Sequence, residues 1–345
     1  MGRLATPGFR RFDQCLPGVM EVTFAGAEAS VAVAVARLGG EARFVTALPD
    51  HDLGDACLAT LRRHGVDSRG SVRRAQSRLG TYYVEAGVNQ RAGQVIYDRE
   101  HSAFATTPAG AYDWASVFEG AGWFVISGIT PALTAGTAEV ARTAIREAAA
   151  RGVPVALDLN YRSKLWTWDP VRAPRDLARD TLRALMPQVD LLVGAPGDAG
   201  LLVDGLPPDE TASPEAAEVA AEAVARSYPR LRHVAFTLRS GTLASSTTFG
   251  GLLLETGTGV RHHAPARGAH YSIPQIVDRL GTGDAFTAGL VFALSSPPLQ
   301  APAAAIAFAT AAGCLAHSIE GDFNLATRAE IEALMQGAAA SRVRR

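Results

Sequence analysis

The residues best suited to chemistry are four consecutive ones, Gly281, Thr282, Gly283 and Asp284. Two glycines beside the start of a helix let backbone N–H groups converge on one point, where the helix dipole adds positive potential. Such a turn can hold a phosphate and the charge that develops on it. A carboxylate there can receive the proton of a hydroxyl that attacks phosphorus. The pattern indicates phosphoryl transfer, although a plain helix cap in a tight turn uses the same residue types.

The elements that must position this turn follow from the apolar periodicity. The segment 276–290 is predicted to run from a strand through the glycine turn into a helix, and the chain beyond Asp284 is predicted to be almost wholly helical. Upstream, helices are expected at 27–38, 52–64, 134–151, 174–186 and 214–228, and strands at 42–48, 123–126, 153–159, 189–193 and 234–238. Strands that alternate with helices predict an α/β fold with a parallel sheet covered on both faces.

One stretch breaks this alternation. Thr81 to Val84 and Gln94 to Tyr97 are two short β-rich runs, separated by a polar segment that contains glycine and asparagine. This pattern predicts a β-hairpin at about residues 81–100, inserted in the α/β chain.

The bulk composition bounds the class of protein. The chain has 345 residues, of which 48% are hydrophobic, and a formal net charge of -1. This predicts a single globular domain over residues 1–345, without the field that would recruit nucleic acid or an anionic membrane. Three widely spaced cysteines fit neither a disulfide framework nor a zinc site, and no apolar run is long enough to span a bilayer. We therefore expect a cytoplasmic protein.

The segment 278–286, Asp-Arg-Leu-Gly-Thr-Gly-Asp-Ala-Phe, closely resembles the C-terminal signature of the ribokinase-like (PfkB) carbohydrate kinases, with Thr282 in place of the usual Ala. The resemblance implies a three-layer α/β/α ribokinase-like fold with a small β lid over the sugar. It also implies that ATP is the phosphoryl donor, that Asp284 is the general base and that Gly281 to Gly283 form the anion hole. The P-loop sequence of other nucleotide-binding proteins is absent.

The resemblance extends over nearly the whole chain and is best to the 2-keto-3-deoxygluconate kinases, which phosphorylate this sugar acid to its 6-phosphate. The similar segments are 24–30, 97–99, 127–133, 158–162 and 321–324. By resemblance, the sugar site would contain Gly26, Ala27, Ser30, Tyr82, Tyr97, Arg99, Arg162 and Asp284. The nucleotide would contact Arg239, Gly241, Gly281 and Gly283, with Mg²⁺ beside it and Asp198 as an indirect metal contact.

The substrate class depends on two arginines. A 2-keto-3-deoxy sugar acid carries a carboxylate, which is best held by a planar cation that makes paired hydrogen bonds. Arg162 follows a predicted buried strand, and ligands of open α/β sheets bind outside the carboxyl ends of strands. Arg99 lies on the predicted hairpin, where the sequence pattern alone would suggest a solvated charge. Only the resemblance implies that Arg99 contacts the carboxylate of the sugar acid.

Three departures from the family pattern leave alternatives open. Ser30 stands where an Asn is usual, and Ala195 replaces the Asn of an Asn-x-x-Glu motif in which Asp198 keeps the carboxylate. Met1 to Pro7 looks like only the end of the family's first strand, either through a shortened gene model or a true truncation. The alternatives are a kinase of a dehydro-deoxygluconate isomer or of fructose, and a low-activity homologue that binds sugar or nucleotide. A homodimer through the lid is expected by resemblance.

Overall fold

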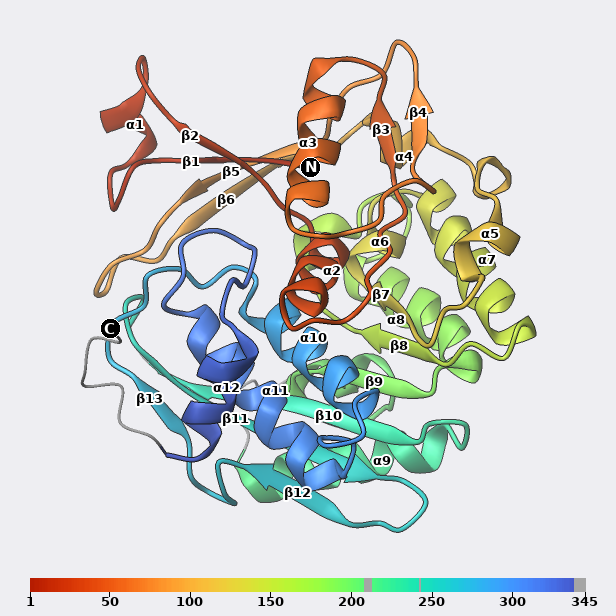
Figure 1. Ribbon diagram of the computed structural model, residues 1–345, viewed down its shortest axis with the longest axis vertical. Coiled ribbons are helices and arrows are strands. Elements are labelled where there is room, and N and C mark those ends of the chain that lie inside the picture. Colours follow the sequence, from red (N-terminus) through yellow and green to blue (C-terminus); the bar gives the residue numbers. More distant parts are fainter. Residues whose placement is uncertain (208–212, 242, 338–345) are drawn as a thin grey trace.

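The architecture is seen in a computed structural model that describes residues 1–207, 213–241 and 243–337. Its main sheet has the strand order β12-β11-β10-β9-β8-β7, and β13 pairs with β11 (Figure 1). The strands are β7 (Phe124–Ser127), β8 (Val155–Asp158), β9 (Leu191–Gly194), β10 (His233–Ser240), β11 (Thr247–Glu255), β12 (Arg261–Ala264) and β13 (Tyr271–Ile273). Strands β7 to β10 are parallel, and β11 runs antiparallel to β10, β12 and β13.

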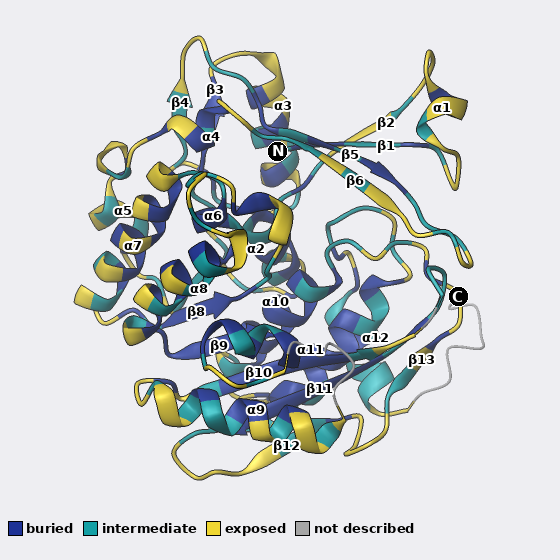
Figure 2. Ribbon diagram, turned by 180° about the vertical axis from the view of Figure 1, so that it is seen from behind, coloured by how far each residue is buried: buried dark blue, intermediate teal, exposed yellow. Residues whose placement is uncertain are grey.

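Helices cover both faces of this sheet, as Figure 2 shows by the buried strands between half-exposed helices. One face packs against α7 (Ala135–Ala150), α8 (Pro174–Leu185) and α9 (Pro214–Ser227). The other face packs against α10 (Thr282–Leu294) and α11 (Pro302–Ala316), and α2 (Ala27–Arg37) lies against α10. Successive residues of β8 point to opposite clusters, Val155 and Leu157 to one and Ala156 to the other. The three-layer α/β/α ribokinase-like fold is therefore confirmed.

A second sheet lies beside the first and contains the predicted hairpin. Its strand order is β2-β1-β5-β6, with β1 (Gly2–Ala5), β2 (Glu21–Phe24), β5 (Thr81–Glu85) and β6 (Gln94–Asp98). Strand β1 pairs antiparallel with β2 and parallel with β5, and β5 pairs antiparallel with β6. We call these four strands the lid sheet.

The remaining α-helices and strands lie around these two sheets. They are α1 (Phe12–Cys15), α3 (Asp52–Arg63), α4 (Ala103–Thr106), α5 (Trp114–Phe118), α6 (Ile129–Ala132), α12 (Arg328–Met335) and the small parallel pair β3 (Ala47–Pro49) and β4 (Val72–Arg74). The helices expected around residues 27–38, 52–64, 134–151, 174–186 and 214–228 are all present.

Three sequence-based expectations about the strands were wrong. The sheet is mixed, because β11 to β13 add an antiparallel half that the pattern did not reveal. Residues 42–46 form only an isolated bridge between Arg43 and Asp67, so the strand there is confined to β3. Residues 276–280 are a loop, because Ile276 and Val277 donate their N–H groups to two different segments, at Ser245 and His317.

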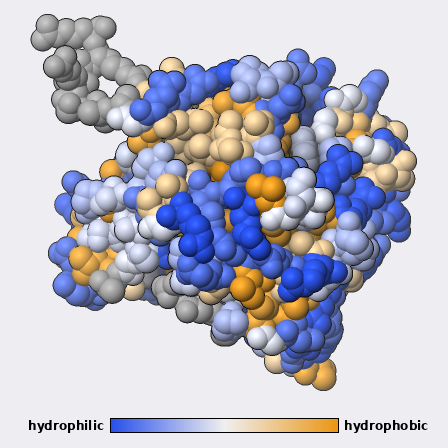
Figure 3. Space-filling view, turned by 90° about the horizontal axis from the view of Figure 1, so that it is seen from below, coloured by the Kyte–Doolittle hydropathy of each residue, from blue (hydrophilic) through white to orange (hydrophobic). Residues whose placement is uncertain are grey.

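The surface opposite the lid sheet is mainly hydrophilic, with hydrophobic side chains in patches between the polar ones (Figure 3). Among the described helices, none is long and apolar enough to cross a membrane. All three cysteines are free thiols in the structure.

Candidate active site

The glycine turn begins α10. Gly281 is the residue before the helix and has a left-handed φ of 78°, a conformation that favours glycine. A Cβ at this position would lie 2.0 Å from the backbone oxygen of Asp322, so the turn packs directly against the 321–324 loop. Thr282 is buried and donates its hydroxyl to the carbonyl of Arg279, so it is accommodated where the family usually has Ala. The first turn of a helix leaves its N–H groups without partners in the helix, and here they border a large cavity.

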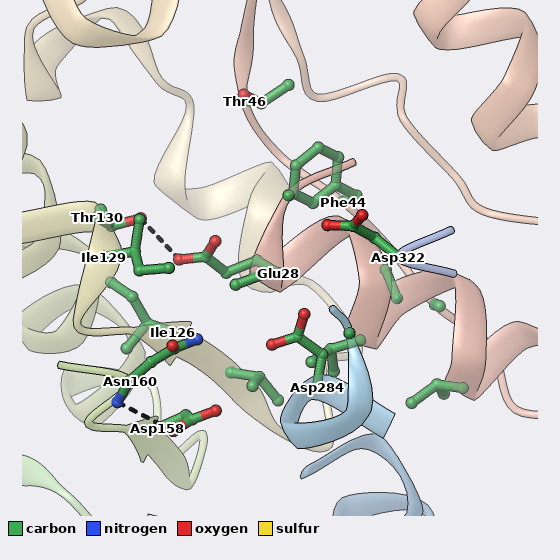
Figure 4. Close-up of a pocket in the computed structure, with 18 of the residues that line it drawn as sticks. Glu28, Phe44, Thr46, Ile126, Ile129, Thr130, Asp158, Asn160, Asp284 and Asp322 are labelled. Atoms are coloured by element: carbon green, nitrogen blue, oxygen red, sulfur yellow. Dashed lines mark hydrogen bonds between the residues drawn. The ribbon is translucent and has the colours of Figure 1, made fainter. Parts of the chain in front are cut away.

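Asp284 lies in this first turn and is buried at the edge of the same cavity. Burial raises the pKa of its carboxyl well above the ordinary value, and the negative charges of Asp158, Asp322 and Glu28 raise it further. Figure 4 shows these acidic side chains, from four different segments, around one space. A carboxylate with a raised pKa accepts a proton more readily than an exposed one, as a general base requires.

Asp158 is the last residue of β8 and faces α10. Its carboxylate accepts hydrogen bonds from the hydroxyl of Thr287, at 3.3 Å, and from the N–H of Asn160, at 3.2 Å. Burial raises its pKa to about 6, while the nearby Arg162 opposes this rise. Asp158 lies in a segment that is similar to the family, 158–162, but the sequence pattern indicated no role for it. Its place at the carboxyl end of a central strand was the available signal.

The N-terminus of α2 brings Glu28 into the site. Its carboxylate accepts the N–H of Ser127 at 3.0 Å and the hydroxyl of Thr130 at 2.6 Å (Figure 4), which joins α2 to the end of β7. Gly26 and Ala27 also line the cavity, as expected. Ser30 does not: its side chain is 1% exposed, and its hydroxyl is buried without a hydrogen-bond partner among the described residues. The structure corrects this expectation, because the Ser30 side chain is buried and does not border the cavity.

The three arginines that were expected in the site, Arg99, Arg162 and Arg239, are among those that line the cavity. Arg99 extends from the end of β6 with its guanidinium 4.4 Å from the centre of the Tyr97 ring, and burial lowers its pKa. Its Nε is buried without a hydrogen-bond partner in the described part of the chain. Arg162 is more exposed and donates to the carbonyl of Tyr161 at 3.0 Å.

Arg239, near the end of β10, approaches the glycine turn. A Cβ at Gly283 would lie 3.6 Å from its Nη2, so the planar cation stands beside the second glycine of the turn. Burial lowers its pKa to about 10, and the positive charge of Arg162 contributes. Gly241 and Asp198 line the same cavity, Asp198 through a short helix, Pro196–Leu201, that follows β9. The residues expected on the nucleotide side therefore share one cavity with those expected on the sugar side.

The two tyrosines expected in the sugar site come from the hairpin of the lid sheet. Tyr82 and Tyr97 are paired across β5 and β6, with ring centres 6.4 Å apart. The hydroxyl of Tyr82 donates to Asp322 at 2.6 Å, which is a role that sequence reasoning did not assign. Burial and the charge of Asp322 raise the pKa of Tyr82.

The cavity that joins these residues has a volume of about 1560 Å³. It continues beyond the acidic cluster, between residues 42–48 and β7, where Phe44, Thr46 and Ile126 lie (Figure 4). Every expected site residue except Ser30 lines this cavity. Glu28 and Asp158 were missed as site residues, because their roles depend on contacts between distant segments. Asp322 was expected on the adenine side, but its carboxylate contacts Tyr82 and Arg3 of the lid sheet.

Comparison with known proteins agrees with this geometry. The profile of the pfkB family carbohydrate kinases matches residues 13–326. This chain belongs to that family. As a member, it is a sugar kinase with a phosphotransferase active site. It is 35% identical over 341 residues to the 2-dehydro-3-deoxygalactonokinase of Haloferax volcanii. The aligned region covers 98% of this chain and 94% of the relative.

Two solved structures are similar over nearly the whole chain. The 2-dehydro-3-deoxygluconokinase of Thermotoga maritima superposes with a TM-score of 0.86 at 36% identity, covering 98% of this chain and 97% of that one. A PfkB family carbohydrate kinase of Listeria grayi superposes with a TM-score of 0.85 at 31% identity, covering 97% of each chain.

Proposed function

We propose that this sugar kinase transfers the γ-phosphoryl group of ATP to the 6-hydroxyl of 2-keto-3-deoxygluconate, the sugar acid also called 2-dehydro-3-deoxygluconate. The observation that carries the proposal is the position of Asp284, a buried carboxyl of raised pKa in the first turn of a helix whose glycine turn borders the cavity. In this reaction a bond forms between the hydroxyl oxygen and phosphorus, and the bond from phosphorus to the β-phosphate oxygen breaks. Asp284 receives the hydroxyl proton, and ADP leaves.

The glycine turn supplies the second part of the mechanism. The N–H groups of the first turn of α10 and the guanidinium of Arg239 would stabilise the charge that gathers on the transferred group. These donors belong to a helix and a central strand, so they are held in place before the reaction begins. This preorganisation costs no rearrangement when the charge develops.

Arg99 supports an acid rather than a neutral sugar as the substrate. A buried guanidinium nitrogen without a partner is unfavourable unless a ligand satisfies it. The pKa of Arg99 is lowered by burial, so a bound carboxylate would also compensate its charge. Arg162 also lines the cavity and is exposed, so it would contribute a more solvated contact.

The galactonate isomer is a second candidate substrate. The observation in its favour is the 35% identity, over nearly the whole chain, to the 2-dehydro-3-deoxygalactonokinase of Haloferax volcanii. The two acids differ in the configuration of one hydroxyl, and both present the same carboxylate to Arg99. Discrimination would therefore come from hydroxyl contacts, which can separate such isomers strongly when the site holds them by hydrogen bonds.

Mg²⁺ would enter with the nucleotide. In the part of the chain that the structure describes, no group of three or more His, Cys, Asp or Glu side chains could hold a metal ion alone. Asp158 and Asp198 line the cavity and offer the oxygen donors that Mg²⁺ prefers, so they fit an ion that is shared with phosphates. When bound, the ion would neutralise charge on the transferred phosphates.

A homodimer through the lid sheet is supported by an apolar row on that sheet. Leu4 is the neighbour of Val22 and of Tyr83, and Tyr83 is the neighbour of Ile96, so the four side chains share one face. Val22 is 65% exposed and Ile96 is 45% exposed. We propose that a second copy of the chain covers this row.

We also propose that a strand ahead of residue 1 occupies the far part of the cavity. Among the described residues, β7 is the outermost strand of its sheet. Across the cavity, the backbone of residues 42–48 pairs on one side, with Asp67 and β4, and no described strand pairs with its other side. The amino group of Met1 is buried in the same cavity, and burial lowers its pKa. Adding six alternating Val and Thr residues before Met1 should raise the unfolding midpoint, whereas the same extension with two prolines should not. Equal midpoints would disprove this proposal.

The test of the kinase activity is ADP release from Mg-ATP with a panel of acceptors. The panel contains 2-keto-3-deoxygluconate, its galactonate isomer, 5-dehydro-2-deoxygluconate, fructose and ribose. We expect turnover with keto-deoxy acids and a loss of about 10²- to 10⁴-fold in kcat for Asp284→Asn, with sugar binding by calorimetry nearly unchanged. Turnover of fructose alone would refute the role of Arg99. Sugar and nucleotide binding without turnover would identify a low-activity binding homologue instead.

A further inference from the structure

Arg3 of the lid sheet forms two buried ion pairs with two loops of the main domain. Its Nη2 lies 2.5 Å from Oδ2 of Asp278, and its Nη1 lies 2.8 Å from Oδ1 of Asp322. The three side chains are 7%, 11% and 12% exposed. Asp278 is more than 270 residues away along the chain, so this contact joins the start of the chain to the loop that precedes α10.

Asp278 and Asp322 both lie against the glycine turn, Asp278 through its carboxylate and Asp322 through its backbone. Asp278 accepts the N–H of Leu280 at 3.0 Å, immediately before the turn, and the N–H of Gly321 at 3.1 Å. Asp322 follows Gly321, and its backbone oxygen stands where a Cβ of Gly281 would collide with it. The pair of carboxylates therefore connects the 278–281 loop to the 321–324 loop, and Arg3 connects both to β1.

The charges make Arg3 necessary for this arrangement. Asp278 and Asp322 are like charges in a poorly hydrated place, and the charge of Asp278 helps to raise the pKa of Asp322. Arg3 opposes that rise, through its charge and its hydrogen bond. Asp322 in turn helps to raise the pKa of Asp284. Without Arg3 the two carboxylates would repel each other or take up a proton, and in either case the turn would lose its support.

We propose that Arg3 is a positioning residue for phosphoryl transfer, which sets the anion-binding turn at Gly281 by bridging Asp278 and Asp322 to the lid sheet. The proposal rests on the kinase reaction proposed above. Arg3 does not line the large cavity, but borders a separate one of about 190 Å³ with Asp278 and Ile276. It therefore acts through the loops and not on the substrates. Tyr82 belongs to the same bridge, because its hydroxyl donates to Asp322 from the neighbouring strand β5.

The test compares Arg3→Met and Arg3→Lys with a matched variant, Arg91→Met. Arg91 also makes a 2.5 Å ion pair in the lid region, with Glu85, but neither residue contacts the 278–281 or 321–324 loop in the described contacts. We expect Arg3→Met to lower kcat about 10- to 100-fold, because a displaced turn misplaces the transferred group. The KM for the sugar acid should change less than about threefold, because Arg3 does not line the substrate cavity. Arg3→Lys should recover only part of kcat, since an ammonium cannot bridge two carboxylates as a planar fork does.

A pH profile separates positioning from a general loss of stability. Loss of Arg3 should let Asp322 take up a proton at higher pH, so the acidic limb of kcat/KM should move upward in Arg3→Met and stay in place in Arg91→Met. Unchanged kcat in Arg3→Met, or an equal loss in Arg91→Met, would overturn the proposal. If Arg3→Met does not fold, the same comparison is made with Arg3→Lys. Failure of the kinase proposal is distinct, because wild type itself would then release no ADP.

Discussion

The cost of an ionised carboxylate at Asp158 can be measured directly. The pKa of this group is raised from 3.8 to about 6, mainly because it is buried. An acid whose pKa is raised by folding destabilises the folded protein once it ionises. This cost is absent below the unfolded pKa, grows between 3.8 and about 6, and is complete above that range. The contribution of Asp158 to the free energy of unfolding should therefore decrease as the pH rises from 3.8 to about 6.

The substitution Asp158→Asn removes the charge and keeps the shape. A pKa raised from 3.8 to about 6 corresponds to about 3 kcal/mol of destabilisation at neutral pH. With an unfolding entropy of about 2.1 cal/mol/K per residue, this is about 4 °C in Tm for a chain of 345 residues. We expect Asp158→Asn to be more stable than wild type at about pH 7.5, and we expect the difference to vanish near about pH 4.

The assay is thermal or urea unfolding of both proteins across that pH range without substrates. Thr287→Val is the matched variant of opposite sign, because the Thr287 hydroxyl donates to the Asp158 carboxylate and lowers its pKa. It should lose more stability at neutral pH than at acidic pH. If wild type and Asp158→Asn differ in unfolding free energy by the same amount at about pH 4 and at about pH 7.5, the assigned pKa of Asp158 is wrong.

Three further outcomes follow from the geometry. Gly281→Ala should destabilise the protein by about 1–3 kcal/mol and lower kcat at least tenfold, because φ is 78° and the new Cβ would meet the backbone oxygen of Asp322. An unchanged kcat would show that this turn is not the anion hole. In the ADP-release assay, Arg99→Ala should raise the KM for the keto-deoxy acid by about 10- to 100-fold, and by more than Arg162→Ala does. An equal rise in KM for a neutral sugar would exclude a contact between Arg99 and the carboxylate. Val22→Lys should convert a dimer into a monomer in light scattering, and a monomeric wild type would contradict the dimer.

Local pattern predicted most of the helices because each helix repeats its own periodicity. Helices α2, α3, α7, α8 and α9 lie where their apolar spacing placed them. The antiparallel half of the sheet was missed because β11 carries two glycines, Gly250 and Gly251, which look like a turn. In the structure a Cβ at Gly251 would lie 2.3 Å from the hydroxyl of Thr310, so the glycine lets α11 approach the sheet.

The sequence by itself determined the reaction class and where the reactive turn stands. Gly281 to Asp284 can be interpreted from adjacent residues, since a helix start and its N–H groups are local features. Only the tertiary structure decided which charges meet at that turn. The burial of Ser30, the raised pKa of Asp158 and the bridge from Arg3 to Asp278 depend on packing and on partners far apart along the chain. Burial weakens the solvation of every charge, so these interactions exist only once the distant segments have packed together.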